Sequence, residues 1–261
     1  MTAKLRSVRP TSRTSDDAEW KCRVELAGAF RIANRLGWNE GIANHFSMVL
    51  PGSSADRFLL NPYELHFSEI TASNLIIADA KGNLIEGKGQ VRSAAFILHG
   101  VLHTHVEHAT AIIHAHPPYS TAISCVKGGR LGRAHANAIG LAKQIVYDDE
   151  MRGVISDEEC KRMVKLVGNR RVIFHAMHGL TTLGRTVADA YDAFYFTERW
   201  AMYTVLGSQL AVQQGKPMHE LAEHILKDTP ERDRGFTPPA AQAHFNAMLR
   251  QLDREEPDYK T

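Results

Sequence analysis

Residues 109–120 read ATAIIHAHPPYS, an apolar run that carries two histidines and stops at two prolines. The run predicts a buried strand, because Pro117 and Pro118 cannot continue a ladder of backbone hydrogen bonds. Residues two apart on a strand face the same side, so His114 and His116 are placed to bind one metal ion. We therefore expect a metal site at the end of this strand, within a larger sheet.

Helical and extended patterns alternate on both sides of the strand. Apolar residues at helical spacing predict helices over residues 16–36, 93–105 and 187–215. Short apolar runs bounded by turn sequences predict strands over residues 42–50, 58–60, 74–87 and 171–178. Together these patterns indicate an α/β fold with an antiparallel sheet, followed by polar helical segments after Gly215.

The composition excludes several classes of protein. With 261 residues, the chain is expected to form one domain with a tail. Its net charge of +2 is too small to attract nucleic acid or anionic lipid. Its apolar runs are shorter than the ~20 residues of a membrane-spanning helix. Its 3 cysteines are widely spaced, which favours a reducing cytoplasm. Residues 1–15 lack the apolar core of a secretory signal and are expected to be a disordered lead.

A metal site needs at least a third ligand. The stretch RVIFHAMHGLTTLGR, residues 171–185, offers His175 and His178, which would face opposite sides of a strand. We expect His178 to join the site, because the following Gly179 lets the backbone turn closely, and His175 to be a packed histidine. The other His-x-His pair, His103 and His105, lies in a helical segment and is expected at a helix surface or interface.

Four stretches carry a resemblance. They are EGIANHFSM (40–48), ADAKGNLIEGKGQVRSAAFILHGVLH (78–103), AIIHAHPPYSTAIS (111–124) and MHGLTTLGRTVADAYDAFYFTER (177–199). In this order and spacing they resemble the class II aldolase/adducin domain family over about residues 18–206. The tail LRQLDREEPDYKT, residues 249–261, resembles a bacterial adducin-like branch of that family.

The resemblance implies an architecture and a ligand set. The fold would be a three-layer α/β/α sandwich with a central, mainly antiparallel sheet, covering residues 16–214, with a C-terminal helical extension over 215–261. The chains would form a homotetramer with sites near the subunit interfaces. One divalent metal per chain, zinc first and manganese or iron as alternatives, would be bound by His114, His116 and His178. Met177 takes the place of the family's asparagine before the third ligand.

Two departures from the family pattern bear on the substrate. The acid/base glutamate of the sugar-phosphate aldolases falls on Ala95. Their phosphate-binding turn falls on NPYE, residues 61–64, and their Ser-Ser pair falls on Ser93 and Ala94. We therefore expect an unphosphorylated substrate, with Asn44, which matches a substrate-binding asparagine, and Ser93 holding its oxygens.

Other residues must then carry protons. His135, in GRAHANAIG, falls within one residue of a family His-Tyr pair that reaches an active site, and Tyr119 follows the ligand turn. Both are expected to be catalytic, although a structural histidine and a packed aromatic are the alternatives. His99 and His103, four apart on one helical face, would line the same cleft or a subunit contact, and we expect the contact for His103.

The expected function is that of a metal-dependent lyase. The ion would stabilise the enolate left when a carbon–carbon bond breaks in a small hydroxy, oxo or aromatic acid. Decarboxylation and retro-aldol cleavage share this step, and the loss of the glutamate at Ala95 favours decarboxylation, which needs fewer proton transfers. The alternatives are a non-heme Fe(II) oxygenase on the same scaffold and a non-catalytic adducin-like protein.

Overall fold

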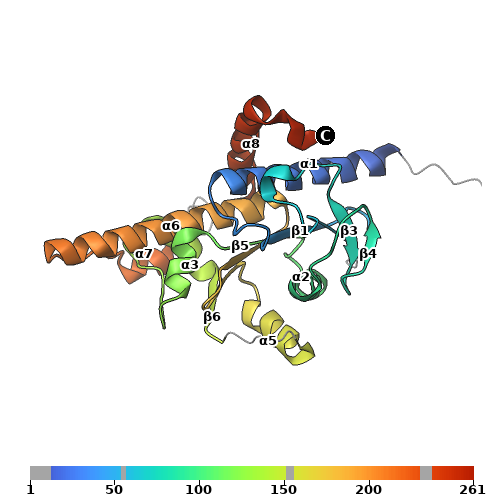
Figure 1. The fold of residues 1–261 in the computed structure, drawn as a ribbon. Helices are drawn as coiled ribbons and strands as arrows, with labels where there is room; N and C mark the ends of the chain where they lie inside the picture. The colour runs from blue at the N-terminus through green and yellow to red at the C-terminus, as the bar shows by residue number, and fades with distance from the viewer. Residues whose placement is uncertain (1–12, 54–56, 151–155, 230–236) are drawn as a thin grey trace, which may run out of the picture.

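The computed structural model describes residues 13–53, 57–150, 156–229 and 237–261. The side chains of residues 13–16 and 93–96, where helices begin, also lie outside the description. Within these limits the chain forms a central sheet with helices on both faces (Figure 1).

Eight strands form one sheet in the order β4-β3-β2-β1-β5-β8-β7-β6. The strands are β1 (His45–Val49), β2 (Arg57–Leu60), β3 (Ile76–Asp79), β4 (Leu84–Glu86), β5 (Ala111–Ala115), β6 (Ile145–Asp148), β7 (Val172–His175) and β8 (Leu180–Gly184). Among the described strands, β6 and β7 pair in parallel and all other neighbours are antiparallel. The expected mainly antiparallel sheet is confirmed, with the histidine-bearing β5 near its centre.

Helices cover the two faces of the sheet as separate layers (Figure 1). On one face lie α1 (Arg13–Arg35), α6 (Val187–Gln214) and α8 (Pro238–Glu255), and on the other lie α2 (Ser93–His105) and α5 (Asp157–Val167). Side chains along β5 alternate between the two faces of the sheet. Ile113 packs into the core beneath α1, α6 and α8, and Ile112 packs into the core beneath α2 and α5. The three-layer α/β/α sandwich is thereby confirmed. The shorter helices are η1 (Phe67–Glu69), α3 (Pro118–Ser124), α4 (Asn137–Leu141), η2 (Ala142–Gln144), α7 (Glu223–Asp228) and η4 (Pro257–Lys260).

The C-terminal segment is anchored to the first helix. The buried guanidinium of Arg31 donates to carboxylates of Glu256 at 3.1 Å and Asp258 at 2.7 Å, and Tyr259 is 1% exposed. Within the expected C-terminal extension, residues 215–261, helix α8 contacts both α1 and α6. Of the expected lead, residues 1–12 lie outside the described residues, and α1 begins at Arg13. The division of the chain at residues 16 and 215 stays a prediction.

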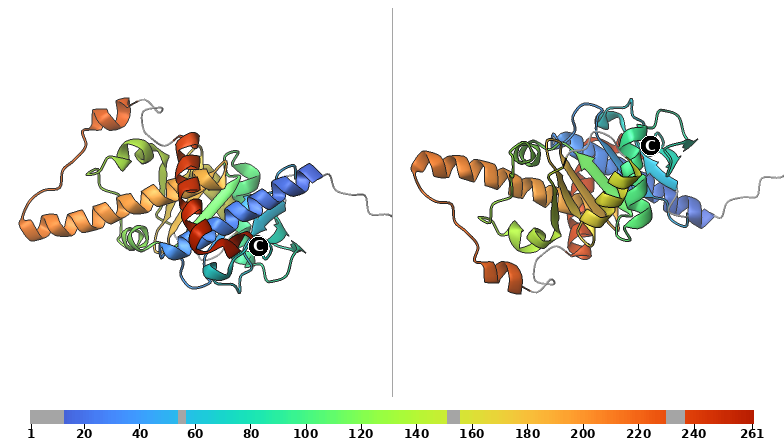
Figure 2. Two further views of the ribbon diagram at one scale, coloured as in Figure 1. Left: turned by 90° about the horizontal axis from the view of Figure 1, so that it is seen from above. Right: turned by 90° about the horizontal axis from the view of Figure 1, so that it is seen from below.

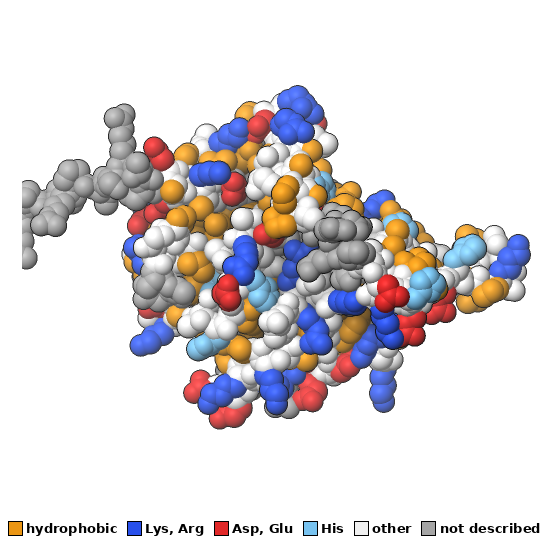
Figure 3. Space-filling view, turned by 180° about the vertical axis from the view of Figure 1, so that it is seen from behind, with side chains coloured by type: hydrophobic (Ala, Val, Ile, Leu, Met, Phe, Trp, Pro, Cys, Tyr) orange, Lys and Arg blue, Asp and Glu red, His pale blue; other side chains and the backbone are white. Residues whose placement is uncertain are grey.

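The second half of α6 projects from the body of the molecule (Figure 2). Leu206, Leu210 and Val212 on this projection are exposed. Over the face shown in Figure 3, basic and acidic side chains are interspersed. No helix among the described residues is long and apolar enough to cross a membrane.

Candidate metal centre

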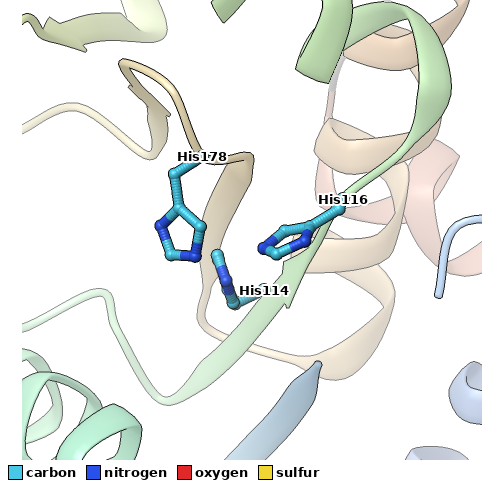
Figure 4. A group of neighbouring side chains, drawn as sticks. All are labelled: His114, His116 and His178. Carbon is cyan, nitrogen blue, oxygen red and sulfur yellow. The ribbon is translucent and has the colours of Figure 1, made fainter. Parts of the chain in front are cut away.

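Three histidines from two neighbouring segments converge at one end of the central strands (Figure 4). His114 lies on β5, His116 follows directly after it, and His178 lies in the turn between β7 and β8. Each offers one ligand atom, and these atoms all lie within 4.8 Å of one another. The structure therefore brings together the three residues that the sequence proposed as ligands.

Neighbouring side chains orient two of the three rings. His114 lies opposite Thr181 in the β5–β8 ladder, and its Nδ1 lies 3.0 Å from the Thr181 hydroxyl. If Nδ1 donates this hydrogen bond, Nε2 of His114 keeps its lone pair. Nδ1 of His116 donates a hydrogen bond to the Glu40 carboxylate, which leaves Nε2 of His116 as the ligand atom.

A buried ring nitrogen without a hydrogen-bond partner indicates that the site fits a divalent metal. Nε2 of His116 is buried and has no hydrogen-bond partner among the described residues. A buried nitrogen without a partner costs free energy, and a metal ion shared with two further imidazoles would satisfy it. The pairing of a carboxylate with the far nitrogen of the same ring, here Glu40, is the usual way in which proteins fix a metal-binding histidine.

Burial keeps His114 and His178 neutral. Desolvation lowers the pKa of His114 well below its usual 6.5, and the neighbouring histidines lower it further. The same causes lower the pKa of His178 to about 4. Both imidazoles therefore hold free lone pairs at pH 7, which is the form that binds a metal.

The turn that carries His178 differs from the expected strand. Strand β7 ends at His175, and residues 176–178 form a tight turn. The expectation that His175 and His178 lie on one strand and face its opposite sides was therefore wrong. His175 lies beside the triad, with Nε2 at 2.9 Å from the same Thr181 hydroxyl that contacts His114. It packs against the ligands without joining the group of ligand atoms.

Met177 occupies a left-handed position in this turn, with φ 58°. This conformation strains most side chains, and asparagine tolerates it best after glycine. The family's asparagine at this position therefore has a structural reason that does not depend on chemistry. Met177 is 64% exposed, so its side chain contributes little packing.

We expect the Met177→Asn variant to be more stable than the wild type, by about 0.5 to 1 kcal/mol, because it removes this strain. Urea denaturation of the two proteins measures the difference. Val126→Asn is the matched control: Val126 is 62% exposed and is absent from the positive-φ positions, so no gain is expected there. An equal gain in both variants would show that polarity, and not backbone strain, is the cause.

A chain of buried histidines lies behind the triad, between β1 and α2. Nδ1 of His103 lies 2.5 Å from the carbonyl oxygen of Ala109, which can only accept, so Nδ1 carries the proton. Nε2 of the neutral ring must then accept from the Ser47 hydroxyl at 2.7 Å, and Ser47 accepts from Nδ1 of His99 at 2.6 Å. His103 is 6% exposed within a single chain, so its expected place at a subunit contact was wrong.

Stability should depend on pH through these histidines. Burial is the main cause that lowers the pKa of His45 to about 3 and of His103 to about 4, and it lowers the pKa of His99 well below 6.5. Below about pH 6.5 these histidines bind protons in the unfolded chain but stay neutral in the folded chain. Their contribution to the free energy of unfolding is therefore complete above pH 6.5 and is lost as the pH falls toward 4. Burial raises the pKa of the Glu25 and Glu198 carboxyls, which act in the opposite direction.

We expect the free energy of unfolding of the metal-free protein to fall between pH 6.5 and 5 by at least about 1.4 kcal/mol per pH unit, the slope of one net proton. Urea denaturation at several pH values measures this slope. A free energy that stays level across this range would mean that the buried histidines are not held neutral.

The remaining predicted site residues do not belong to the group of ligand atoms. Asn44 is buried next to it, and its Oδ1 accepts from the backbone N–H of Glu40 at 2.6 Å. Ser93 begins α2, but its side chain lies outside the described part of the structure. Tyr119 is half-buried in α3, where its backbone N–H donates to Glu198. His135 packs against Tyr203 of α6 at 4.3 Å between ring centroids.

Sequence reasoning missed three residues of the site. Glu40 contacts a ligand that is 76 positions away in the chain, so no spacing could have indicated the pair. His45 pairs with His114 across the β1–β5 ladder, with ring centroids 5.0 Å apart. Arg92, next to the predicted Ser93, lies close enough for its charge to lower the pKa of His45 and of His178.

Comparisons with known proteins agree with this architecture. The sequence model of the class II aldolase and adducin N-terminal domain matches residues 24–205. A protein of Caulobacter vibrioides, provisionally named an aldolase class 2 protein, is 31% identical over 245 residues, which cover 93% of each chain. The α-adducin of Rattus norvegicus is 28% identical over 91% of this chain and 34% of its own length. An aldolase II superfamily protein from Pseudomonas syringae superimposes with a TM-score of 0.84 at 27% identity, covering 97% of this chain and 98% of the other.

Proposed function

Since this chain belongs to the class II aldolase and adducin family, we propose that it is a metal-dependent lyase. It would break a carbon–carbon bond in a small hydroxy, oxo or aromatic acid that carries no phosphate. The observation that supports this most strongly is the triad of His114, His116 and His178, whose ligand atoms lie within 4.8 Å of one another. A member that serves only as a scaffold would not need these three side chains to converge.

The triad would hold one divalent ion, with zinc as the first choice and manganese or iron as alternatives. When bound, the ion would supply Lewis-acid polarisation of a substrate oxygen next to the bond that breaks. The protein's own part is orientation: the Thr181 hydroxyl fixes the His114 ring, and the Glu40 carboxylate fixes the His116 ring. The hydrogen bond with His116 also lowers the pKa of the Glu40 carboxyl, so this group stays ionised and keeps its hold on the ring at neutral pH.

The proton transfers favour decarboxylation over retro-aldol cleavage. Retro-aldol cleavage needs a base that takes the proton of the hydroxyl that becomes a carbonyl, and an acid for the carbanion, whereas decarboxylation needs only the acid. Ala95 stands where the sugar-phosphate aldolases have their glutamate. We propose Tyr119 and His135 as proton carriers. Tyr119 lies in α3, separated from the ligand His116 by Pro117 and Pro118, whereas His135 lies beside α6 and would serve a site completed by another subunit.

We further propose that the chain forms a homotetramer in the cytoplasm, with its sites near subunit interfaces. The exposed apolar residues Leu206, Leu210 and Val212 on the projecting half of α6 support self-association. The cysteines Cys22, Cys125 and Cys160 are free, which suits a reducing compartment. Light scattering after gel filtration measures the assembly, and a monomeric mass would contradict it.

Zinc-loaded protein incubated with a panel of small unphosphorylated hydroxy, oxo and aromatic acids tests the activity. Release of carbon dioxide identifies a decarboxylase, and release of an aldehyde identifies an aldolase. Consumption of dioxygen by the iron-loaded protein would instead indicate the oxygenase alternative. A protein that takes up no metal would contradict the lyase and support a non-catalytic adducin-like role.

A further inference from the structure

A row of four polar side chains crosses the sheet, beginning at the ligand His114. The residues are His114, Thr181, His175 and Asp148, one from each of the neighbouring strands β5, β8, β7 and β6. The Thr181 hydroxyl oxygen lies 3.0 Å from Nδ1 of His114 and 2.9 Å from Nε2 of His175. Nδ1 of His175 lies 3.7 Å from Oδ2 of Asp148. Each of the four residues is at most 9% exposed, so their contact with water is limited.

The far end of this row is a carboxylate whose orientation is fixed. Oδ1 of Asp148 forms an ion pair with the Arg162 guanidinium at 2.9 Å and accepts from the backbone N–H of Glu150 at 3.3 Å. Arg162 is itself held by two hydrogen bonds to the Glu159 carboxylate, at 2.5 and 2.8 Å. Both donors to Asp148 engage Oδ1, so Oδ2 is the oxygen that lies toward His175.

The Thr181 hydroxyl makes the tautomers of the two histidines depend on each other, because it carries a single proton. If this proton is donated to Nε2 of His175, the Thr181 oxygen accepts from Nδ1 of His114, and Nε2 of His114 keeps a lone pair for a metal. If the proton is donated to Nδ1 of His114 instead, the neutral ring carries its own proton on Nε2 and cannot bind a metal there. The direction of the hydrogen bonds therefore decides whether His114 is ready to be a ligand.

The Asp148 carboxylate favours the first direction. An ionised carboxylate attracts an N–H group and repels a lone pair, so the proton of neutral His175 is more stable on Nδ1, the nitrogen nearer to Asp148. Nε2 of His175 then holds the lone pair that accepts from Thr181. The distance of 3.7 Å exceeds that of a hydrogen bond, so Asp148 acts by electrostatic attraction, which is stronger in a buried site than in water.

We infer that Asp148 is a positioning residue of the metal centre, which acts through His175 and Thr181 to hold His114 in the tautomer that binds a metal. This role rests on the proposed function, because it serves a metal that the triad would hold. No net charge moves along the row. The inference gives His175 a task that is compatible with its place beside the ligands and outside the group of ligand atoms.

The tautomer is measured in the metal-free protein by nitrogen NMR of the imidazole rings at pH 8, with the His114 signals assigned by their loss in His114→Gln. We expect the wild type to carry the proton of His114 on Nδ1. In Asp148→Asn the amide oxygen stays with the donors to Oδ1, so the amide NH₂ lies toward Nδ1 of His175 and reverses the row. The proton of His114 is then expected on Nε2.

Asp149→Asn is the matched control. Asp149 is the next residue in the chain, is exposed and pairs with Arg130, so this variant should keep the wild-type tautomer of His114. The same tautomer of His114 in the wild type and in Asp148→Asn, or a proton on Nε2 of His114 in the wild type, would overturn the inference.

Zinc affinity, measured against a competing chelator, shows whether Asp148 acts through the hydroxyl. Asp148→Asn is expected to weaken zinc binding at least about tenfold, and Asp149→Asn is expected to leave it unchanged. Thr181→Val removes the hydroxyl at nearly constant shape, so adding Asp148→Asn to it should change the affinity by no more than about twofold. An equal loss in both backgrounds would mean that the charge of Asp148 acts directly on the ion, and would overturn the inference.

The two measurements separate this inference from the proposed function. If the wild type takes up no zinc, the metal-dependent lyase fails, yet the tautomers of His114 in the metal-free proteins still test the row. Circular dichroism shows whether each variant keeps the fold. If Asp148→Asn does not fold, Thr181→Val takes its place in the tautomer measurement, where it is expected to lose the preference for Nδ1, and an unchanged preference would overturn the inference.

Discussion

The His116→Ala variant is expected to lose stoichiometric zinc, whereas the wild type takes up about one ion per chain. Removal of an outer partner of a metal ligand typically costs 10- to 100-fold in affinity, and removal of the ligand itself should cost more than 100-fold. Nε2 of His116 is a buried atom without a hydrogen-bond partner among the described residues, and its removal leaves two of the three ligand atoms of the triad. Elemental analysis and titration against a competing chelator measure the loss.

His105→Ala is the matched control for this experiment. His105 belongs to the other His-x-His pair, lies at the end of α2 and is exposed, so the variant should bind zinc as the wild type does. Zinc retained by His116→Ala at the wild-type affinity would contradict the site. Loss of zinc from both variants would point to unspecific binding by a histidine-rich chain.

Local periodicity predicted the elements that carry the site, because strand geometry depends on neighbours in the sequence. The spacing of two predicted that His114 and His116 share one side of a strand; in the structure His114 lies on β5 and His116 directly after it, and their ligand atoms lie within 4.8 Å of each other and of that of His178. The helix over residues 93–105 agrees with α2 at both ends. The local patterns also indicated an antiparallel sheet, whereas the three-layer arrangement of its helices followed from the resemblance, whose motifs extend across most of the chain.

Contacts between distant segments could not be predicted in the same way. His103 was expected at an interface because its helical face was known and its neighbours were not. In the structure Ser47, from a strand 56 residues away, occupies that face and hydrogen-bonds to it. The turn at Met177 was missed for another reason: an apolar residue gives no signal for a left-handed backbone, which glycine or asparagine would have given.

The site therefore depends on close backbone approach as much as on ligand chemistry, and Gly179 is where this dependence is sharpest. A Cβ atom at Gly179 would lie 2.5 Å from Cδ2 of His116 and 2.6 Å from the carbonyl oxygen of Ala115. The histidine ring could yield, but the Ala115 carbonyl belongs to strand β5, which is held on both sides by the sheet. Relief must come from the turn, which would carry His178 away from the other two ligands.

We therefore expect Gly179→Ala to lower zinc affinity more than 100-fold although all three ligands remain, because small displacements of a constellation of this kind have large costs. The same competition titration measures the change, and circular dichroism confirms that the sheet persists. Gly132→Ala is the control: its Cβ would meet the nearest described atom, in Thr204, at an ordinary 3.5 Å, so no change in zinc affinity is expected. Unchanged affinity in Gly179→Ala would mean that the turn adapts freely, and that the position of His178 is set by the metal rather than by the backbone.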